Sequence, residues 1–173
     1  AYDVMGRVQM EQGQLEQALD TFDQACRLTP HSITRLQKQG MLAFMMGDRE
    51  AAARSLARAT LVGSQSKLFD CQSVVLLAFV RFRDKDRKAL QRCAGTLATA
   101  AQRQGADARL VRFQGVVGVL VDLLDRKVAA AQDTLRGMAA ELGADGFDVE
   151  AACNLLTLLA EVAAAEVRLD DAD

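Results

Sequence analysis

A set of residues recurs at an interval of 34 in the first third of the chain. Identical residues stand at five such pairs of positions: Gly6 and Gly40, Gly13 and Gly47, Glu16 and Glu50, Ala18 and Ala52, Ala25 and Ala59. The large residues Tyr2 and Phe22 are followed at the same interval by Leu36 and Leu56. A fixed period of this length indicates a repeat architecture, in which neighbouring units bury the apolar faces that one unit leaves exposed.

The types of the recurring residues predict a pair of antiparallel helices. Gly6 and Ala18 fall on facing sides of the two helices, where small side chains allow the axes to approach to about 8–10 Å. Phe22 fills the space beside this contact, and Gly13 stands where the chain turns. Pro30 ends the second helix, because it has no backbone N–H to donate. Half of the residues are apolar and only one is proline, which favours helix throughout.

The period and the order of small and large residues resemble the tetratricopeptide repeat, a helix–turn–helix unit. The resemblance implies an all-α right-handed superhelix of antiparallel hairpins with a C-terminal capping helix. We expect one repeat domain over residues 1–173, with repeats at about 1–31, 32–65, 69–104 and 107–142 and a terminal helix at about 148–168. By the spacing of the family the chain begins two residues into its first repeat, so we expect a fragment of a longer protein.

The helices are expected at about 1–12, 15–28, 33–46, 49–61, 69–83, 86–103, 107–124, 128–142 and 148–168. Ser32 and Asp107 are candidate N-caps. The segment from Val62 to Asp70 is expected to form a loop, because glycine and two serines interrupt the period. In the third repeat, Ala89 is matched to Ala18 through an insertion of three residues. In the fourth, Gly118 and Ala130 are twelve residues apart, as Gly6 and Ala18 are.

The sequence gives no motif for a metal, a cofactor or catalysis. The four cysteines Cys26, Cys71, Cys93 and Cys153 form no CxxC pair, so we expect reduced core residues of a cytoplasmic protein. His31 is the single histidine and has no nucleophile near it in sequence. The pairs Asp84/Asp86 and Asp170/Asp171 are interpreted as turn-forming and solvated residues. No apolar run is long enough to span a membrane. We therefore expect a protein that is not an enzyme.

The resemblance also implies a binding surface. Tetratricopeptide domains usually bind a peptide or protein segment on the concave surface lined by the first helix of each hairpin. Matched position by position, this surface comprises Asp3, Arg7, Met10, Gln37, Met41, Phe44, Met45, Val74, Ala78 and Arg81. The methionines would give an adaptable apolar strip, although part of the stripe is equally well explained as core. The carboxylate clamp of chaperone-binding members is missing, since the only asparagine is Asn154 in the last helix.

Charge is distributed unevenly along the chain. Residues 1–23 carry one Arg against five acidic residues, residues 24–112 carry sixteen Lys/Arg against six, and residues 113–173 carry four against twelve. The basic middle predicts an acidic partner segment or an acidic region elsewhere in the chain. It also raises a nucleic-acid alternative, through Arg49, Arg54, Arg58, Arg81, Arg83, Lys85, Arg87, Lys88 and Arg92. Aromatic residues do not interleave with these side chains, which argues against that alternative.

The segment Ser32 to Ser73 is similar to the tetratricopeptide region of certain bacterial two-component response regulators. This similarity implies a signalling protein with a receiver domain upstream of Ala1. The main hypothesis is therefore a non-catalytic protein-interaction or scaffolding module, and the oligomeric state is left open. The alternative is a module that binds nucleic acid or another acidic ligand through the basic middle region.

Overall fold

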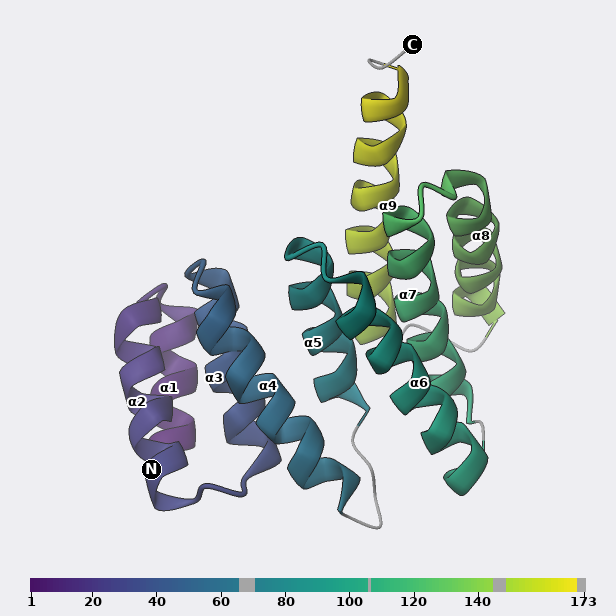
Figure 1. Cartoon of the computed structure of the whole chain (residues 1–173). Helices are drawn as coiled ribbons and strands as arrows, with labels where there is room; N and C mark the ends of the chain where they lie inside the picture. Colours follow the sequence, from purple (N-terminus) through teal and green to yellow (C-terminus); the bar gives the residue numbers. More distant parts are fainter. Residues whose placement is uncertain (66–70, 106, 145–148, 171–173) are drawn as a thin grey trace. The chain divides into compact units, whose positions relative to one another are not determined.

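Every regular element in the described part of the chain is an α-helix. The computed structural model describes residues 1–65, 71–105, 107–144 and 149–170, and the side chains of 104, 141–144, 149–153, 155 and 166–170 lie outside this description. The helices, labelled in Figure 1, are α1 Tyr2–Glu11, α2 Leu15–Leu28, α3 Ile33–Met45, α4 Arg49–Ser64, α5 Gln72–Arg83, α6 Arg87–Gln104, α7 Ala108–Leu124, α8 Val128–Ala144 and α9 Val149–Asp170. The predicted fold class and the order of the helices are confirmed.

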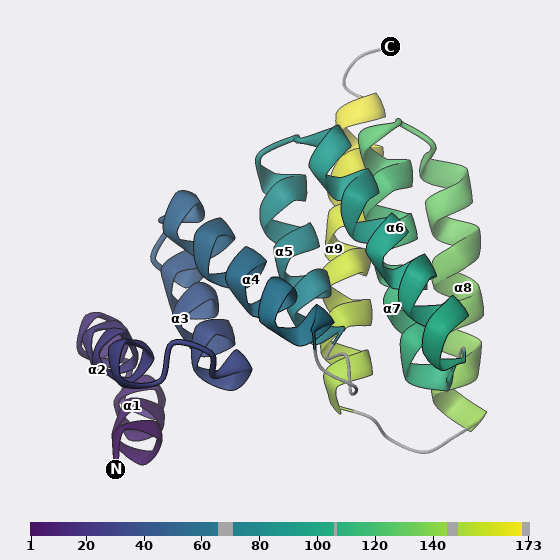
Figure 2. The ribbon, with the colours of Figure 1, turned by 60° about the horizontal axis from the view of Figure 1, so that its bottom comes forward.

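The chain divides into two compact units, Ala1–Val80 and Arg81–Asp173, with the boundary near the end of α5. In the first unit, α1 packs on α2, α2 on α3, and α3 on α4. In the second unit, α6, α7 and α8 pack in the same consecutive way, and α9 packs against both α7 and α8 (Figure 2). Each unit is therefore a stack of antiparallel helices.

The four hairpin turns share one backbone geometry, which fixes the true alignment of the repeats. The N–H of Gly13 donates to the carbonyl of Met10, three residues back, and the next N–H donates to the carbonyl five residues before it. The same pair of hydrogen bonds recurs at Gly47, Lys85 and Arg126. All four residues have positive φ, at +74°, +85°, +55° and +57°. This is the Schellman motif that commonly ends helices.

The close crossings predicted at Gly6 and Gly40 are confirmed. A Cβ atom placed on Gly6 would lie 2.6 Å from the Phe22 ring, and one on Gly40 would lie 2.6 Å from Cγ of Leu56. Both glycines are buried. The glycine therefore lets the first helix of each hairpin rest directly on a large side chain of the second helix, which makes the two sites sensitive to any added side chain.

The predicted register of the third repeat is wrong by one residue. The turn residue Lys85 corresponds to Gly13, so the insertion comprises four residues and Ala78, rather than Leu77, takes the place of Gly6. Leu90 then takes the place of Ala18, and both Ala78 and Leu90 are fully buried. One residue rotates a helical position by about 100°, so the shift moves every matched side chain to another face of α5.

The predicted crossing of Gly118 with Ala130 in the fourth repeat is also wrong. Nothing lies within 4 Å of a Cβ built on Gly118, and Ala130 is exposed. The turn residue Arg126 corresponds to Gly13, so Val119 and Ala131 take the places of Gly6 and Ala18, and both are fully buried. The spacing of twelve therefore holds in the fourth hairpin, but the predicted pair was displaced by one residue. Only the turn residue fixes where the pair lies.

The ends of the helices follow the sequence with two exceptions. Asp107 caps α7, since its carboxylate accepts a hydrogen bond from the N–H of Leu110 at 2.7 Å. Asp48 and Asp86 cap α4 and α6 in the same way. Ser32 occupies the N-cap of α3, but its side chain makes no capping bond. Residues 62–64, expected in a loop, continue α4 because Gly63 is buried, and 66–70 lie outside the described residues.

Three of the cysteines, Cys26, Cys71 and Cys93, are buried and form no disulfide within the described part of the chain. Burial raises the pKa of Cys26 and raises that of Cys93 to about 11, so both thiols stay protonated at neutral pH. The side chain of Cys153 lies outside the described residues. None of the described helices is long and apolar enough to cross a membrane.

Candidate interaction surface of the first unit

The ten sequence-predicted surface residues differ widely in exposure. Asp3, Arg7 and Met45 are exposed, whereas Met10, Met41, Phe44 and Arg81 are half-buried. Gln37, Val74 and Ala78 are buried, the last two at 1% and 0% exposure. A buried side chain offers no area to a partner in this conformation, so the structure reduces the predicted set to seven residues.

The register of α5 explains why Val74 and Ala78 do not line a surface. Both were matched through the insertion of three residues, whereas the hairpin turn requires four. With the correct register, Phe79 and Phe82 correspond to Arg7 and Met10, and both are half-buried. The signal was visible in the sequence, because Asp48-Arg49 and Asp86-Arg87 follow the turn residue in the second and third hairpins.

Gln37 serves the packing of the unit. Its side-chain amide donates a 2.8 Å hydrogen bond to the hydroxyl of Ser73 on α5, and both residues are buried. A buried amide needs such a partner, because an unsatisfied polar group in the core costs about 1–3 kcal/mol. Gln37 therefore joins α3 to α5 instead of contacting a partner.

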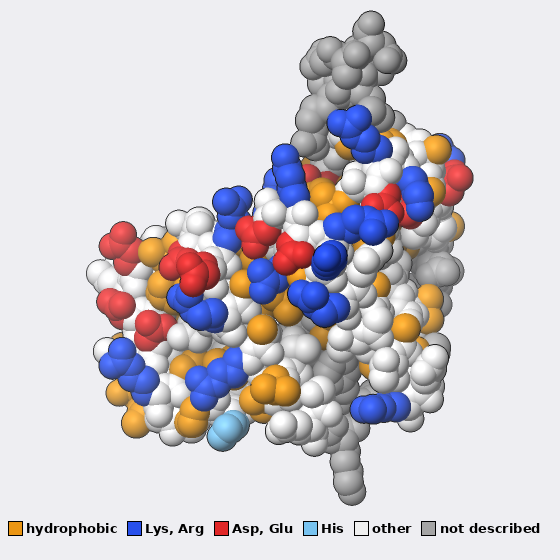
Figure 3. Space-filling view, in the orientation of Figure 1, with side chains coloured by type: hydrophobic (Ala, Val, Ile, Leu, Met, Phe, Trp, Pro, Cys, Tyr) orange, Lys and Arg blue, Asp and Glu red, His pale blue; other side chains and the backbone are white. Residues whose placement is uncertain are grey.

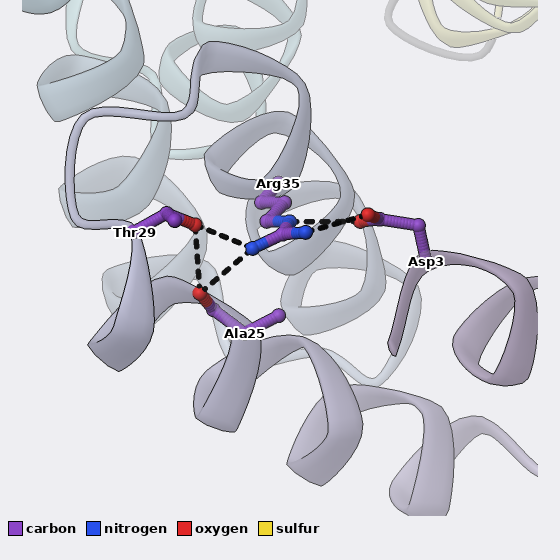
Figure 4. Close-up of polar contacts among 4 residues, drawn as sticks. All are labelled: Asp3, Ala25, Thr29 and Arg35. Carbon is purple, nitrogen blue, oxygen red and sulfur yellow. Dashed lines mark hydrogen bonds and ion pairs between the residues drawn. The ribbon is translucent and has the colours of Figure 1, made fainter. Parts of the chain in front are cut away.

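Asp3 is exposed but already has a partner within the chain. The guanidinium of Arg35 donates to both carboxylate oxygens of Asp3, at 2.9 and 2.6 Å, and also to Thr29 Oγ1 and to the carbonyl oxygen of Ala25 (Figure 4). The network joins α1, the end of α2 and the start of α3. The hydrogen bond from Arg35 is the main reason that the pKa of Asp3 is lowered. Asp3 thus fixes the junction between the first two hairpins.

The remaining residues of α1 and α3 form an apolar surface, which we call the methionine surface: Met10, Met41, Phe44 and Met45. Met10 packs against the core of Ala18, Phe22 and Leu42, and Phe44 packs against the core that contains Leu56. Met45 is 56% exposed. Met10 and Phe44 contact the core and also remain partly exposed, so they can contact a partner while the core stays folded. Methionine can also adapt its shape to different apolar segments.

The outer face of α1 carries a second apolar surface that the sequence reasoning missed. Val4, Met5 and Val8 are 58%, 47% and 41% exposed. Val8 corresponds by the 34-residue period to Leu42, which is fully buried against Ala18 and Phe22 of the preceding helix. The period could have identified this face, because it matches Val8 to Leu42. The equivalent position in the second hairpin is covered by the preceding helix.

Four of the nine basic residues of the alternative hypothesis are paired with acids. Among the described residues, Arg54 bonds Glu50, Arg81 lies 3.7 Å from Asp84, Arg83 bonds Glu161, and Arg87 bonds Asp125. Arg58, Lys85, Lys88 and Arg92 have no ion pair there. Figure 3 shows Lys and Arg side chains interspersed with acidic and hydrophobic ones, rather than gathered into one continuous stripe. This mixture is typical of a solvated surface.

The described residues contain no group of three or more His, Cys, Asp or Glu side chains that could hold a metal ion. His31 is exposed beside the helix-ending Pro30, with no hydrogen bond or ion pair from another described residue. Its position fits the surface-loop role expected from the sequence.

Comparisons with known proteins identify a structural similarity without a close relative in sequence. No protein-family model matches the chain, and no curated protein matches it significantly. The chain is similar to the solved structure of the MamA RS-1 ArsTM double mutant, with a TM-score of 0.56 and 15% identity over 99% of this chain and 96% of that one. A crystal structure of MamA matches with a TM-score of 0.54 and 14% identity over 96% of each chain.

These matches give the similarity to response regulators no support. At this level of identity they show the fold and not the function. The nine helices described here pack as sequential hairpins. This arrangement matches the tetratricopeptide-like fold of MamA.

Proposed function

We propose that this chain is a non-catalytic module that binds a protein partner through the methionine surface of its first unit. The observation that carries the proposal is the partial exposure of Met10, Met41, Phe44 and Met45 on α1 and α3. A core residue would be covered by the fold, whereas these four residues are each half-buried or exposed. The partner segment we expect is an apolar helix or extended strand, because methionines and an aromatic side chain contribute area and few directed hydrogen bonds.

Charge supports an apolar mode of binding in this unit. Residues 1–80 contain eight Lys/Arg and eight Asp/Glu, so the unit is close to neutral. Arg7 lies 3.9 Å from Glu11, and Asp3 is bound by Arg35, which leaves little free charge beside the surface. We therefore expect affinity to depend weakly on salt, in contrast with an electrostatic interface.

The test is capture of partners from a bacterial lysate by the intact chain and by the double variant Met41→Ser/Phe44→Ser. We expect the variant to capture about tenfold less partner, or even less, since hot-spot residues contribute about 2 kcal/mol or more each. Its circular dichroism should still show a helical protein. Met46→Ser is the matched control: Met46 is 40% exposed on the same hairpin but lies at the turn, outside the methionine surface.

Capture that is unchanged in the double variant would remove the methionine surface from the proposal. Capture that disappears on nuclease treatment would instead favour the nucleic-acid alternative. In that case a charge reversal at Arg58, Lys88 and Arg92, which have no ion pair among the described residues, should weaken binding and reduce its salt dependence.

The finer hypotheses on context remain proposals. A signalling role and an upstream receiver domain rest on the similarity of residues 32–73 to certain response regulators, whereas the cytoplasmic location rests on the cysteines, which are expected to be reduced. The sequence of the full-length protein upstream of Ala1 would decide among them. A phosphorylatable receiver domain there would place the methionine surface at the output of a two-component system.

A further inference from the structure

The second unit contains a cavity of about 350 Å³ between two hairpin turns and the last helix. Its apolar wall consists of Phe82 from the end of α5, Leu123 and Leu124 from the end of α7, Val128 from the start of α8, and Ala165 from α9. The volume lies in the range of small-ligand pockets. Phe82 lies three residues before the turn residue Lys85, and Leu123 lies three residues before the turn residue Arg126. Equivalent positions of two successive hairpins therefore contribute to this wall.

Three cations and one anion also line the cavity: Arg83, Lys85, Arg126 and Glu161. Glu161 is buried at 9% exposure, and Arg83 donates a hydrogen bond to its carboxylate. Lys85 and Arg126 make no ion pair with any described residue. The three carboxylates adjacent in sequence have other partners, since Asp84 lies 3.7 Å from Arg81, Asp86 caps α6, and Asp125 binds Arg87 and Lys127. The cavity thus holds an excess of two positive charges beside an apolar wall.

The hairpin turns place the two cations in a backbone conformation that is unfavourable for residues with a side chain. Lys85 and Arg126 have φ of +55° and +57°, a conformation that favours glycine. The first two hairpins place Gly13 and Gly47 at the same position of the same turn. A hollow at the turns of the first unit, lined by Gly13–Gln17 and Met46, contains no Lys or Arg. Among the four turns, glycine, which adopts positive φ more readily, is therefore replaced by a basic residue only in the two turns that line the cavity.

We propose that this cavity binds a carboxylate carried on an apolar body, with the carboxylate between Lys85 and Arg126 and the apolar body against Phe82, Leu123 and Val128. Charge-assisted hydrogen bonds from the two cations fit a carboxylate, and Arg126 can bind both of its oxygens. The wall then excludes water from the rest of the ligand. The site lies in the second unit, so it is independent of the methionine surface.

Two sources of this chemistry fit the cavity: a free medium-chain carboxylate and the C-terminus of a peptide that ends in an apolar residue. The experiment titrates the intact chain with octanoate and with a short peptide ending in leucine, and follows binding by calorimetry. Octylamine and the same peptide with a C-terminal amide are the matched probes without a carboxylate. We expect saturable binding of at least one carboxylate probe in the millimolar range or tighter, and none of its matched probe. The probe that binds identifies the source.

The variants Lys85→Gly and Arg126→Gly separate binding from folding. Each substitution removes a cation and places glycine at a position with positive φ. Each should therefore raise the melting temperature and weaken the binding of the carboxylate probe by about tenfold. Lys88→Gln is the matched control, because Lys88 is an exposed cation of α6 outside the cavity. It should leave affinity within about twofold.

Binding that survives both glycine variants, or that Lys88→Gln weakens equally, would overturn the proposal. The same holds if neither carboxylate probe binds. If a glycine variant lowers both the melting temperature and the affinity, the side chain acts in folding and the proposed role is wrong.

Discussion

The two units differ in how far other helices cover the first helix of each hairpin. In the first unit, the residues of the methionine surface on α1 and α3 stay half-buried or exposed, although Phe44 belongs to a cluster with Leu76 and Leu77 of α5. In the second unit, α9 packs against α7 and reaches Arg83 at the end of α5 through Glu161. The chain therefore covers with its own last helix, in one unit, the kind of surface that it offers in the other. The same hairpin can act as a binding element or as a core element, depending on what covers it.

The hairpin turns show a parallel difference. In the first unit they contain Gly13 and Gly47, which adopt positive φ without strain, and both close crossings at Gly6 and Gly40 are glycine. In the second unit the turns contain Lys85 and Arg126, and the buried Val119 takes the place of Gly6 in the fourth hairpin. The first unit keeps the regular repeat, whereas the second keeps the backbone of the turn and changes the side chains around it.

The strongest test of this comparison concerns α9. Leu158 is fully buried, so Leu158→Ala should lower the free energy of unfolding by about 2–5 kcal/mol. Leu156→Ala on the same helix should change it by less than about 0.5 kcal/mol, because Leu156 is 66% exposed. Urea denaturation measures both. Equal small effects would mean that α9 is a loosely attached tail and that the two units do not differ as described.

Glycine substitutions should have opposite signs in the two units. Gly40→Leu places a side chain against Leu56 and should cost about 1–3 kcal/mol or more. Gly118→Ala adds a Cβ to open space within α7 and should stabilise by roughly 0.5–1 kcal/mol, through helix propensity alone. Melting temperatures of the two variants and the parent measure both effects. A destabilising Gly118→Ala would show a hidden crossing in the fourth hairpin and restore the predicted equivalence with Gly6.

The smallest expected effect is the pH dependence of the junction between the first two hairpins. Arg35 lowers the pKa of Asp3, so folding is favoured above the ordinary aspartate pKa of about 3.9. This contribution is lost as the pH falls through the lowered pKa of the folded state. Asp3→Asn should therefore be less stable than the parent at about pH 6, and the difference should shrink towards about pH 3.

Urea midpoints at both pH values measure the change at Asp3. Glu11→Gln is the control, since Glu11 lies 3.9 Å from Arg7 with both side chains exposed. A difference between Asp3→Asn and the parent that stays constant with pH would mean that the ion pair with Arg35 does not form in solution.

The sequence by itself determined the repeat and the positions at which the two helices of a hairpin pack most closely. Gly6 and Gly40 could be identified because a 34-residue period with small residues facing large ones has a direct steric cause, which acts within one hairpin. The helix ends also followed from local chemistry, as at Asp107, whose carboxylate caps a backbone N–H three residues away. The methionine surface was identified in part for the same reason, since Met10, Met41, Phe44 and Met45 keep the regular register.

Only the tertiary structure decided which matched positions are surface. Val74 and Ala78 were assigned through an insertion of the wrong length, and a one-residue error turns a helix by about 100°. The cavity at Lys85 and Arg126 could not be predicted either, because its wall joins α5, α7, α8 and α9, and Phe82 and Ala165 are 83 positions apart in sequence. A local pattern records the shape of one hairpin. It does not record which helix from elsewhere in the chain covers that hairpin, and burial depends on that cover.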